Sequence, residues 1–98
     1  MQSHYFMLTY DFDPAHRTEE NFRFMDEGLK NEDWLPLGPR HSFTLEVEAD
    51  NPTKAHRIAV HSVEHAYKDH GAQGVLSVAL QFGPEPLVEL ELREVAGG

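Results

Sequence analysis

Two histidines four residues apart, His61 and His65, are the pair in this chain best spaced for metal chemistry. They fall within residues 51–71, whose pattern predicts one long helix, so the two imidazoles would lie one turn apart on one side of it. Two imidazoles in this position can bind one Zn²⁺, and Glu64 between them could act as a base. Two histidines on a solvated helix face would show the same spacing, and we favour that interpretation. We therefore predict no metal site and no cofactor.

The five residues His61-Ser62-Val63-Glu64-His65 are similar to the His-x-x-Glu-His signature of the inverzincins. In that family the two histidines bind zinc and the adjacent glutamate serves as the base. The resemblance covers only these five positions, and it implies a third protein ligand from a distant helix. Asp69 cannot bind the same metal ion as His61, because it lies eight positions further along the helix, about 12 Å along the axis.

Tyr10 and Asp11 end a predicted strand, residues 4–12. This position resembles the tyrosine-aspartate pair of the Cas2 family of small, dimeric, metal-dependent nucleases. The resemblance implies that Asp11 from each subunit would hold a metal at the dimer axis. It covers two residues and the order of the elements, and the basic cluster expected after the strand is reduced to Arg17 and Arg23. The alternative is that Asp11 closes the strand and supports the turn that follows.

The predicted long helix has both of its ends marked in the sequence. Asn51 is suited to cap the first turn, Pro52 costs nothing at the first helical position, and Gly71 fits a left-handed residue after the last turn. One side of this helix is apolar and should face a sheet. Its members are Ala55, Ala59, Val60, Val63, Ala66 and Tyr67.

The remaining elements are predicted from apolar composition, from the alternation of apolar and polar residues, and from helical spacing. Residues 4–12 are rich in aromatic and apolar side chains and end at Asp13-Pro14, which predicts a strand. Apolar and polar residues alternate at residues 41–49, 74–82 and 87–95, which predicts three more strands. A shorter helix is predicted within residues 14–31, starting either after Asp13-Pro14 or at Thr18. Two prolines exclude a central strand from residues 32–40, so we interpret Trp34–Leu37 as a short edge strand or an extended loop.

This order of elements predicts a single α+β domain, residues 1–98. If Trp34–Leu37 counts as a strand, the order is the split βαβ arrangement called ferredoxin-like, βαββαβ, with an extra C-terminal strand. The sheet would be antiparallel, with both helices on one face and the proline-containing strand at an edge. The alternative leaves residues 32–40 as pure loop.

The net charge of the chain limits the classes of partner that it can bind. Seventeen acidic residues against eight basic ones give a formal net charge of −9, which disfavours nucleic acid and fits a basic protein partner, or a protein surface that normally receives nucleic acid. The alternative for nucleic acid is a local basic strip of Lys54, Arg57 and Lys68 on the predicted long helix. The predicted partner is a protein or a small ligand. There is no cysteine, so disulfides and thiolate metal sites are excluded. No secretory signal is visible and no run approaches the roughly 20 apolar residues of a membrane span, so a cytoplasmic location is the default expectation.

The predicted function is that of a small acidic, non-enzymatic binding or regulatory module. We expect it to form a homodimer through a sheet face or edge, because the outward residues of the predicted strands 4–12 and 74–82 make one mildly apolar patch. The predicted interface residues are Tyr5, Met7, Thr9, Val75 and Ala79. The alternative is a metal-dependent hydrolase, either a Cas2-like nuclease using Asp11 or an enzyme with a metal at His61 and His65.

Overall fold

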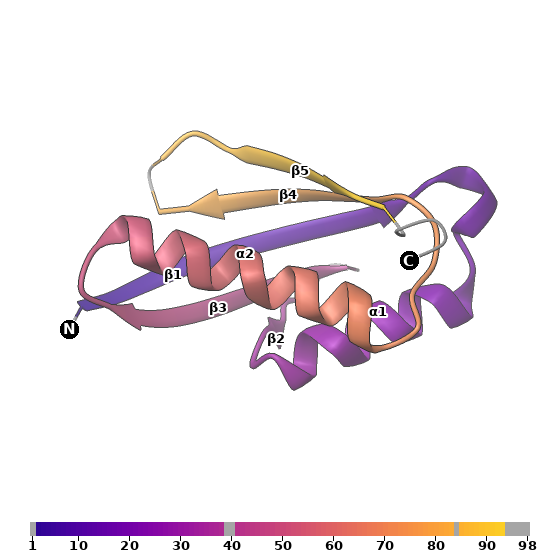
Figure 1. The fold of residues 1–98 in the computed structure, drawn as a ribbon, viewed down its shortest axis with the longest axis horizontal. Coiled ribbons are helices and arrows are strands. Elements are labelled where there is room, and N and C mark those ends of the chain that lie inside the picture. The colour runs from indigo at the N-terminus through magenta and orange to yellow at the C-terminus, as the bar shows by residue number, and fades with distance from the viewer. Residues whose placement is uncertain (1, 39–40, 84, 94–98) are drawn as a thin grey trace.

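The protein forms a five-stranded antiparallel sheet with two helices packed on one face (Figure 1). The computed structural model describes residues 2–38, 41–83 and 85–93. The strands are β1 (Gln2–Phe12), β2 (Leu35–Pro36), β3 (Ser42–Ala49), β4 (Leu76–Phe82) and β5 (Val88–Leu92). The helices are α1 (Glu19–Asn31) and α2 (Pro52–Asp69), preceded by a 3₁₀ turn at Pro14–His16. The predicted α+β class is therefore confirmed.

The strands lie in the order β2-β3-β1-β4-β5, and every neighbouring pair is antiparallel. This arrangement is compatible with the predicted ferredoxin-like sandwich. It differs from a four-stranded sandwich by β5, which extends the sheet beyond β4. Pro36 lies in the edge strand β2, where its missing N–H costs no internal ladder bond.

The long helix has the ends that its sequence predicts. The Asn51 side chain accepts from the N–H of Lys54 at 2.9 Å, and Pro52 occupies the first turn. Gly71 has a φ of +85°, a left-handed conformation that glycine adopts without strain. The buried side of α2 consists of Ala55, Ala59, Val63, Ala66 and Tyr67, while Val60 is half-buried.

The shorter helix begins at the second of its two predicted starts. The Thr18 hydroxyl accepts from the N–H of Asn21 at 3.1 Å and caps α1. The earlier residues make only the 3₁₀ turn, because Asp13 uses its side chain on other partners. Met25 and Leu29 are buried under α2 and the sheet.

The segment between α1 and β3 is mostly loop, and its two-residue strand β2 pairs with Phe43 and Thr44. Trp34, just before β2, is almost completely buried at 1 % exposure. Its indole N–H donates to the Ser62 hydroxyl on α2 at 2.8 Å. The tryptophan thus anchors the sheet edge beneath the long helix.

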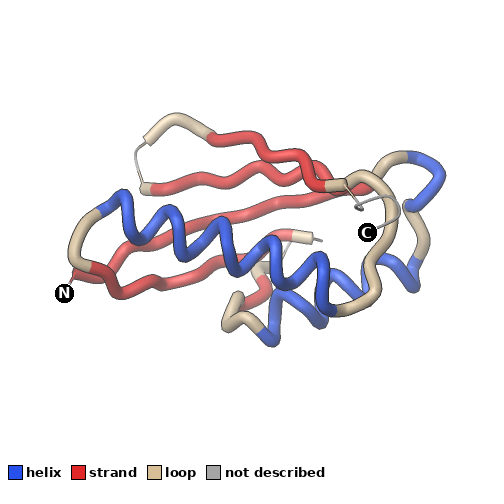
Figure 2. Tube along the Cα trace, in the orientation of Figure 1, coloured by secondary structure: helices blue, strands red, loops and turns tan. Residues whose placement is uncertain are grey.

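The helices do not cover the whole inner face of the sheet. Figure 2 shows α2 lying along β1 and β3, with β4 and β5 extending beyond it. As a result the inward residues of β5, which are Val88, Leu90 and Leu92, are only half-buried. The predicted last strand ends at Leu92 in the described residues, and its predicted end at residue 95 lies outside them.

Candidate functional site

The face of the sheet opposite the helices is open and carries most of the exposed large hydrophobic side chains. Tyr5 and Met7 on β1 are 60 % and 54 % exposed, and Leu35 on β2 is 65 % exposed. Leu87, just before β5, is 53 % exposed. Only Ile58, on α2, is a further exposed large hydrophobic residue within the described ranges. Four such side chains on one face of a small protein are typical of a contact site.

The strand register arranges three of these side chains in one row across the sheet. Leu35 pairs with Thr44, Thr44 pairs with Met7, and Met7 pairs with Gln81. Leu87 continues the row beside Gln81, because the preceding pair is Leu80 with Val88. Side chains of paired residues point to the same face, so the row runs leucine, threonine, methionine, glutamine, leucine. We call these five residues the apolar row.

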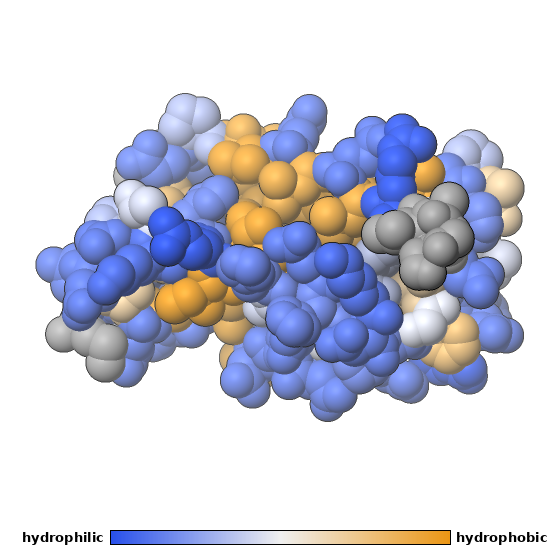
Figure 3. Space-filling model, in the orientation of Figure 1, coloured by the Kyte–Doolittle hydropathy of each residue, from blue (hydrophilic) through white to orange (hydrophobic). Residues whose placement is uncertain are grey.

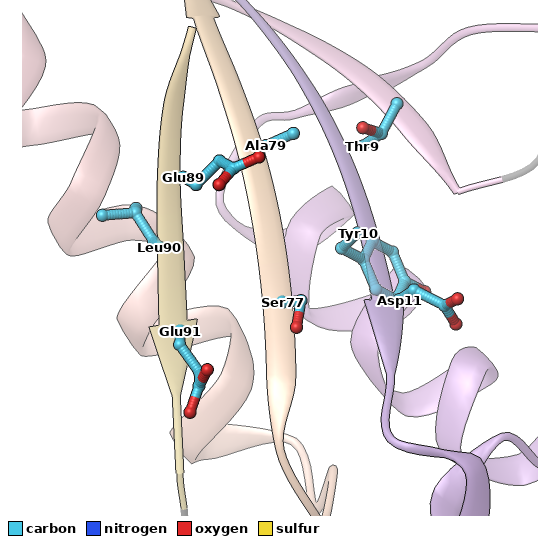
Figure 4. Close-up of a pocket in the computed structure, with 8 residues that line it drawn as sticks. All are labelled: Thr9, Tyr10, Asp11, Ser77, Ala79, Glu89, Leu90 and Glu91. Carbon is cyan, nitrogen blue, oxygen red and sulfur yellow. The ribbon is translucent and has the colours of Figure 1, made fainter.

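Two shallow hollows lie on this face beside the apolar row. The smaller, about 210 Å³, is mainly apolar, with Met7, Leu37, Ala79 and Leu87 among its lining residues. The larger lies between β1 and β5 and is lined on this face by Thr9, Asp11, Ser77, Ala79, Glu89 and Glu91. Figure 4 looks onto it from the open side, with the helices behind the sheet.

Apart from Asp11 on β1, the carboxylates of the strands on this face occupy two opposite corners. Glu46 and Glu48 on β3 lie beside the first half of β1, since they pair with Tyr5 and Ser3. Glu89 and Glu91 lie on β5 at the far corner, opposite Ala79 and Ser77 of β4. Glu91 forms an ion pair with Arg93. Among the described residues, Glu46, Glu48 and Glu89 have no ion-pair partner, so the face is acidic at both corners and apolar between them.

The structure places the predicted interface residues as follows. Tyr5, Met7 and Thr9 are outward residues of β1, and Ala79 pairs with Thr9 from β4. Val75 precedes β4, and its N–H and C=O bond the side chain and backbone of Asp13 at 2.8 and 3.0 Å. Val75 is therefore separated from the apolar row by the polar pair of Asp11 and Ser77.

The residues considered for metal chemistry are not brought together. His61 and His65 are exposed on α2, with their Nδ1 atoms 3.8 Å from Glu64 and 3.2 Å from Asp69. Ser62, inside the same motif, points inward to Trp34. In the described part of the chain no group of three or more histidine, aspartate or glutamate side chains is placed to hold a metal ion.

Asp11 already has two partners. Its Oδ1 accepts from the N–H of Phe12 at 2.8 Å and lies 3.2 Å from Nε of Arg17. The strand-closing interpretation of Asp11 accounts for both contacts, and the arginine opposes a cation at this carboxylate.

One cluster of titratable groups could not be identified from the sequence. The Tyr10 hydroxyl donates to Asp26 Oδ1 at 2.5 Å and to the Phe22 carbonyl at 3.1 Å, tying β1 to α1. Burial, reinforced by Asp26, raises the pKa of Tyr10 far above its ordinary value. Tyr10 therefore remains a neutral donor and is no nucleophile. No local pattern reveals this pairing, since Tyr10 reads as an ordinary inward strand residue.

His41 completes the same cluster. Its ring stacks on Phe22 at 4.0 Å and lies 5.2 Å from Tyr10. It has a φ of +57°, and its Nδ1 is buried without a hydrogen-bond partner among the described residues. The sequence predicts His41 as the first residue of a strand, whereas β3 begins one residue later because His41 turns the chain.

A second apolar surface lies on the helical side, in the gap that α2 leaves over β5. Figure 3 shows apolar atoms gathered there between the polar surface of α2 and the outer strands. The half-buried hydrophobic residues on this side include Val60, Phe82, Val88, Leu90 and Leu92, all packed against the core. Because these side chains are partly covered, they present less accessible surface per residue than those of the open sheet face.

Comparisons with family models, with curated proteins and with solved structures find no match for this chain. No helix in the described ranges has the length and apolar character needed to cross a membrane.

Proposed function

We propose that the protein is a small acidic binding or regulatory module without enzymatic activity, which forms a homodimer through the open face of its sheet. The observation that carries the proposal is the exposure of Tyr5, Met7, Leu35 and Leu87 on that one face. Removing apolar surface from water contributes roughly 25 cal/mol per Å², so burying these exposed side chains on association would be favourable. A cytoplasmic location remains a prediction.

A two-fold partner suits this face because the apolar row is symmetric about β1. Met7 is at its centre, Thr44 and Gln81 flank it, and a leucine lies at each end. An isologous interface brings the same patch from two subunits together, which requires a patch complementary to itself. The row satisfies that requirement with apolar groups at its centre and ends, and with hydrogen-bonding groups between them.

The competing proposal is a metal-dependent hydrolase that uses Asp11, or His61 with His65. The ion pair of Asp11 with Arg17, and the contacts of the His61 and His65 Nδ1 atoms with Glu64 and Asp69, give the binding proposal more support. Titration with Mg²⁺, Mn²⁺ and Zn²⁺, followed by histidine and aspartate NMR shifts, separates the two. A stoichiometric shift confined to these residues would favour the hydrolase.

The homodimer is tested by placing charge at the centre of the apolar row. Met7→Glu should raise the dimer dissociation constant by at least about 100-fold, which corresponds to ~2.7 kcal/mol, because a carboxylate would be buried against its own copy. Sedimentation measures the association, and circular dichroism checks that the fold is unchanged.

The matched control is Ile58→Glu. Ile58 is 47 % exposed, close to the 54 % of Met7, but it lies on α2. This variant should gain the same charge and keep the wild-type association. A monomeric wild type, or a Met7→Glu protein that stays dimeric, would reject the open face as the interface.

A further inference from the structure

We infer that the two copies pack their open faces with their strands aligned, about a two-fold axis passing by Met7, and not with their strands at right angles. This inference rests on the proposed homodimer and adds its geometry. Face-to-face sheets pack either within about 30° of alignment or near 90°. The acidic corners decide between these two modes.

The two acidic corners are diagonally opposed on the face. On an ideal sheet, with strands about 4.8 Å apart and alternate residues roughly 6.7 Å apart, Glu46 and Glu89 are separated by roughly 20 Å. Their diagonal crosses β1 between Tyr5 and Met7. The apolar row lies between the corners, so an axis near Met7 has one acidic corner on each side.

A right-angle packing needs an axis that runs diagonally across this face. Rotation about the diagonal that passes through both acidic corners places each corner against the same corner of the partner subunit. Rotation about the other diagonal places the Glu46 and Glu48 corner on the partner's Glu89 and Glu91 corner. Both cases bring carboxylates into contact at low dielectric, which costs far more than it would in water. Among the described residues of the two corners, Glu91 pairs with Arg93, whereas Glu46, Glu48 and Glu89 have no ion-pair partner.

An aligned packing needs an axis along β1 or across it, and both directions separate the acidic corners. An axis along β1 places Glu89 over the region of Leu37 and Ser42, which lie together because Leu37 N–H donates to the Ser42 carbonyl at 2.8 Å. It also brings the two copies of Asp11 near each other, and each of these carries its own Arg17. An axis across the strands places Glu46 over Ser42. Neither direction superposes the two corners.

The apolar row fits the aligned mode as well. In both aligned directions the row meets its own copy, so Met7 faces Met7 and each leucine faces a leucine of the partner subunit. Right-angle packing instead carries Leu35 over Tyr5 or over Thr9 of the second copy. The aligned mode thus buries the methionine of the row against the partner's methionine, and each leucine of the row against a leucine of the partner subunit.

Because the chain contains no cysteine, an introduced cysteine is its only thiol, and cross-linking of single-cysteine variants can test this geometry. Single variants Met7→Cys, Leu35→Cys, Leu87→Cys, Tyr5→Cys and Thr9→Cys are each checked for wild-type melting and for dimerisation by sedimentation. They are then treated with a short bis-maleimide, alone and in mixed pairs. Ile58→Cys is the matched control for cross-links that arise from random collision.

The expected result is that Met7→Cys links to itself, and that Leu35→Cys links either to itself or to Leu87→Cys. Links between Leu35→Cys and Tyr5→Cys or Thr9→Cys, in place of these, would overturn the aligned mode. Dimeric variants that give no link above the Ile58→Cys control would overturn it too. Monomeric variants, together with a monomeric wild type, would instead reject the homodimer on which the inference rests.

Discussion

Gly28 lies where α1 crosses α2, and a Cβ atom built at this position would be 2.4 Å from the Ala66 carbonyl oxygen. The oxygen belongs to the backbone of α2, so the contact cannot be relieved by moving one side chain. In an exposed helix, glycine to alanine stabilises by about 1 kcal/mol. Here we predict the opposite sign: Gly28→Ala should lower the free energy of unfolding by about 1–3 kcal/mol.

Chemical denaturation measures this change, and Gly38→Ala is its control. Nothing lies within 4 Å of a Cβ atom at Gly38, and its φ is not in the left-handed region. Gly38→Ala should leave stability within about 0.5 kcal/mol of wild type. If Gly28→Ala is as stable as the control, the close helix crossing is wrong.

Asp13 is a residue whose protonation should be visible in stability. Hydrogen bonds from His16 and from the Val75 N–H lower the pKa of its carboxyl below the ordinary value of 3.8. The charged form is therefore favoured by folding, and its stabilisation is complete above the unfolded-state pKa. It is lost as the pH falls through the lower, folded-state pKa.

We predict that wild type is more stable than Asp13→Asn at neutral pH and that the difference shrinks once the pH falls below about 4. Urea denaturation of both proteins at pH 2–7 measures it. A difference that stays constant to pH 2 would mean that the Asp13 carboxylate charge contributes nothing.

At the scale of elements, Ser62 links α2 to the edge of the sheet. Its hydroxyl accepts from the buried Trp34 N–H at 2.8 Å and donates to the Ala59 carbonyl at 2.8 Å. Ser62→Ala would leave the indole N–H without a partner, so we predict a loss of about 1–2 kcal/mol in the free energy of unfolding. Ser77→Ala, on the exposed face of β4, should change it by less than about 0.5 kcal/mol. Equal stability of the two variants would contradict the role of Ser62.

The same elements show what the sequence could predict. Alternation identified the inward face of β1, and helical spacing identified the buried side of α2, because both depend on periods that local geometry imposes. The burial of Trp34 could not be predicted, since the prolines near it indicated only an edge or a loop. Its partner lies 28 residues away on α2.

The half-burial of β5 has a related cause. Periodicity correctly gave Val88, Leu90 and Leu92 an inward direction, but it contains no information on how far a helix extends over a sheet. For the candidate site, the outward positions of Tyr5, Met7, Thr9 and Ala79 were predictable from alternation, whereas the row with Leu35 and Leu87 depended on the register of β2 and β5.

At the scale of the whole molecule, association must overcome the repulsion between two chains of net charge −9. The open face adds to this repulsion, because Glu46, Glu48 and Glu89 lack ion-pair partners among the described residues. Salt screens such interactions over a Debye length of about 10 Å at 0.1 M and about 3 Å at 1 M. The proposed dimer should therefore tighten as salt is added.

We predict that the dissociation constant of the dimer falls by at least about threefold between 0.05 M and 0.5 M NaCl, because salt screens the repulsion between the two acidic subunits. Sedimentation at fixed pH measures this change. Glu89→Gln removes one of the unpaired carboxylates and should both tighten the dimer at low salt and reduce its salt dependence, whereas Glu20→Gln, an exposed charge on α1, should alter it less. Dissociation on adding salt would mean that ion pairs between subunits hold the dimer. The interface would then include the exposed basic residues of α2, which are Lys54, Arg57 and Lys68, in place of two acidic sheet faces.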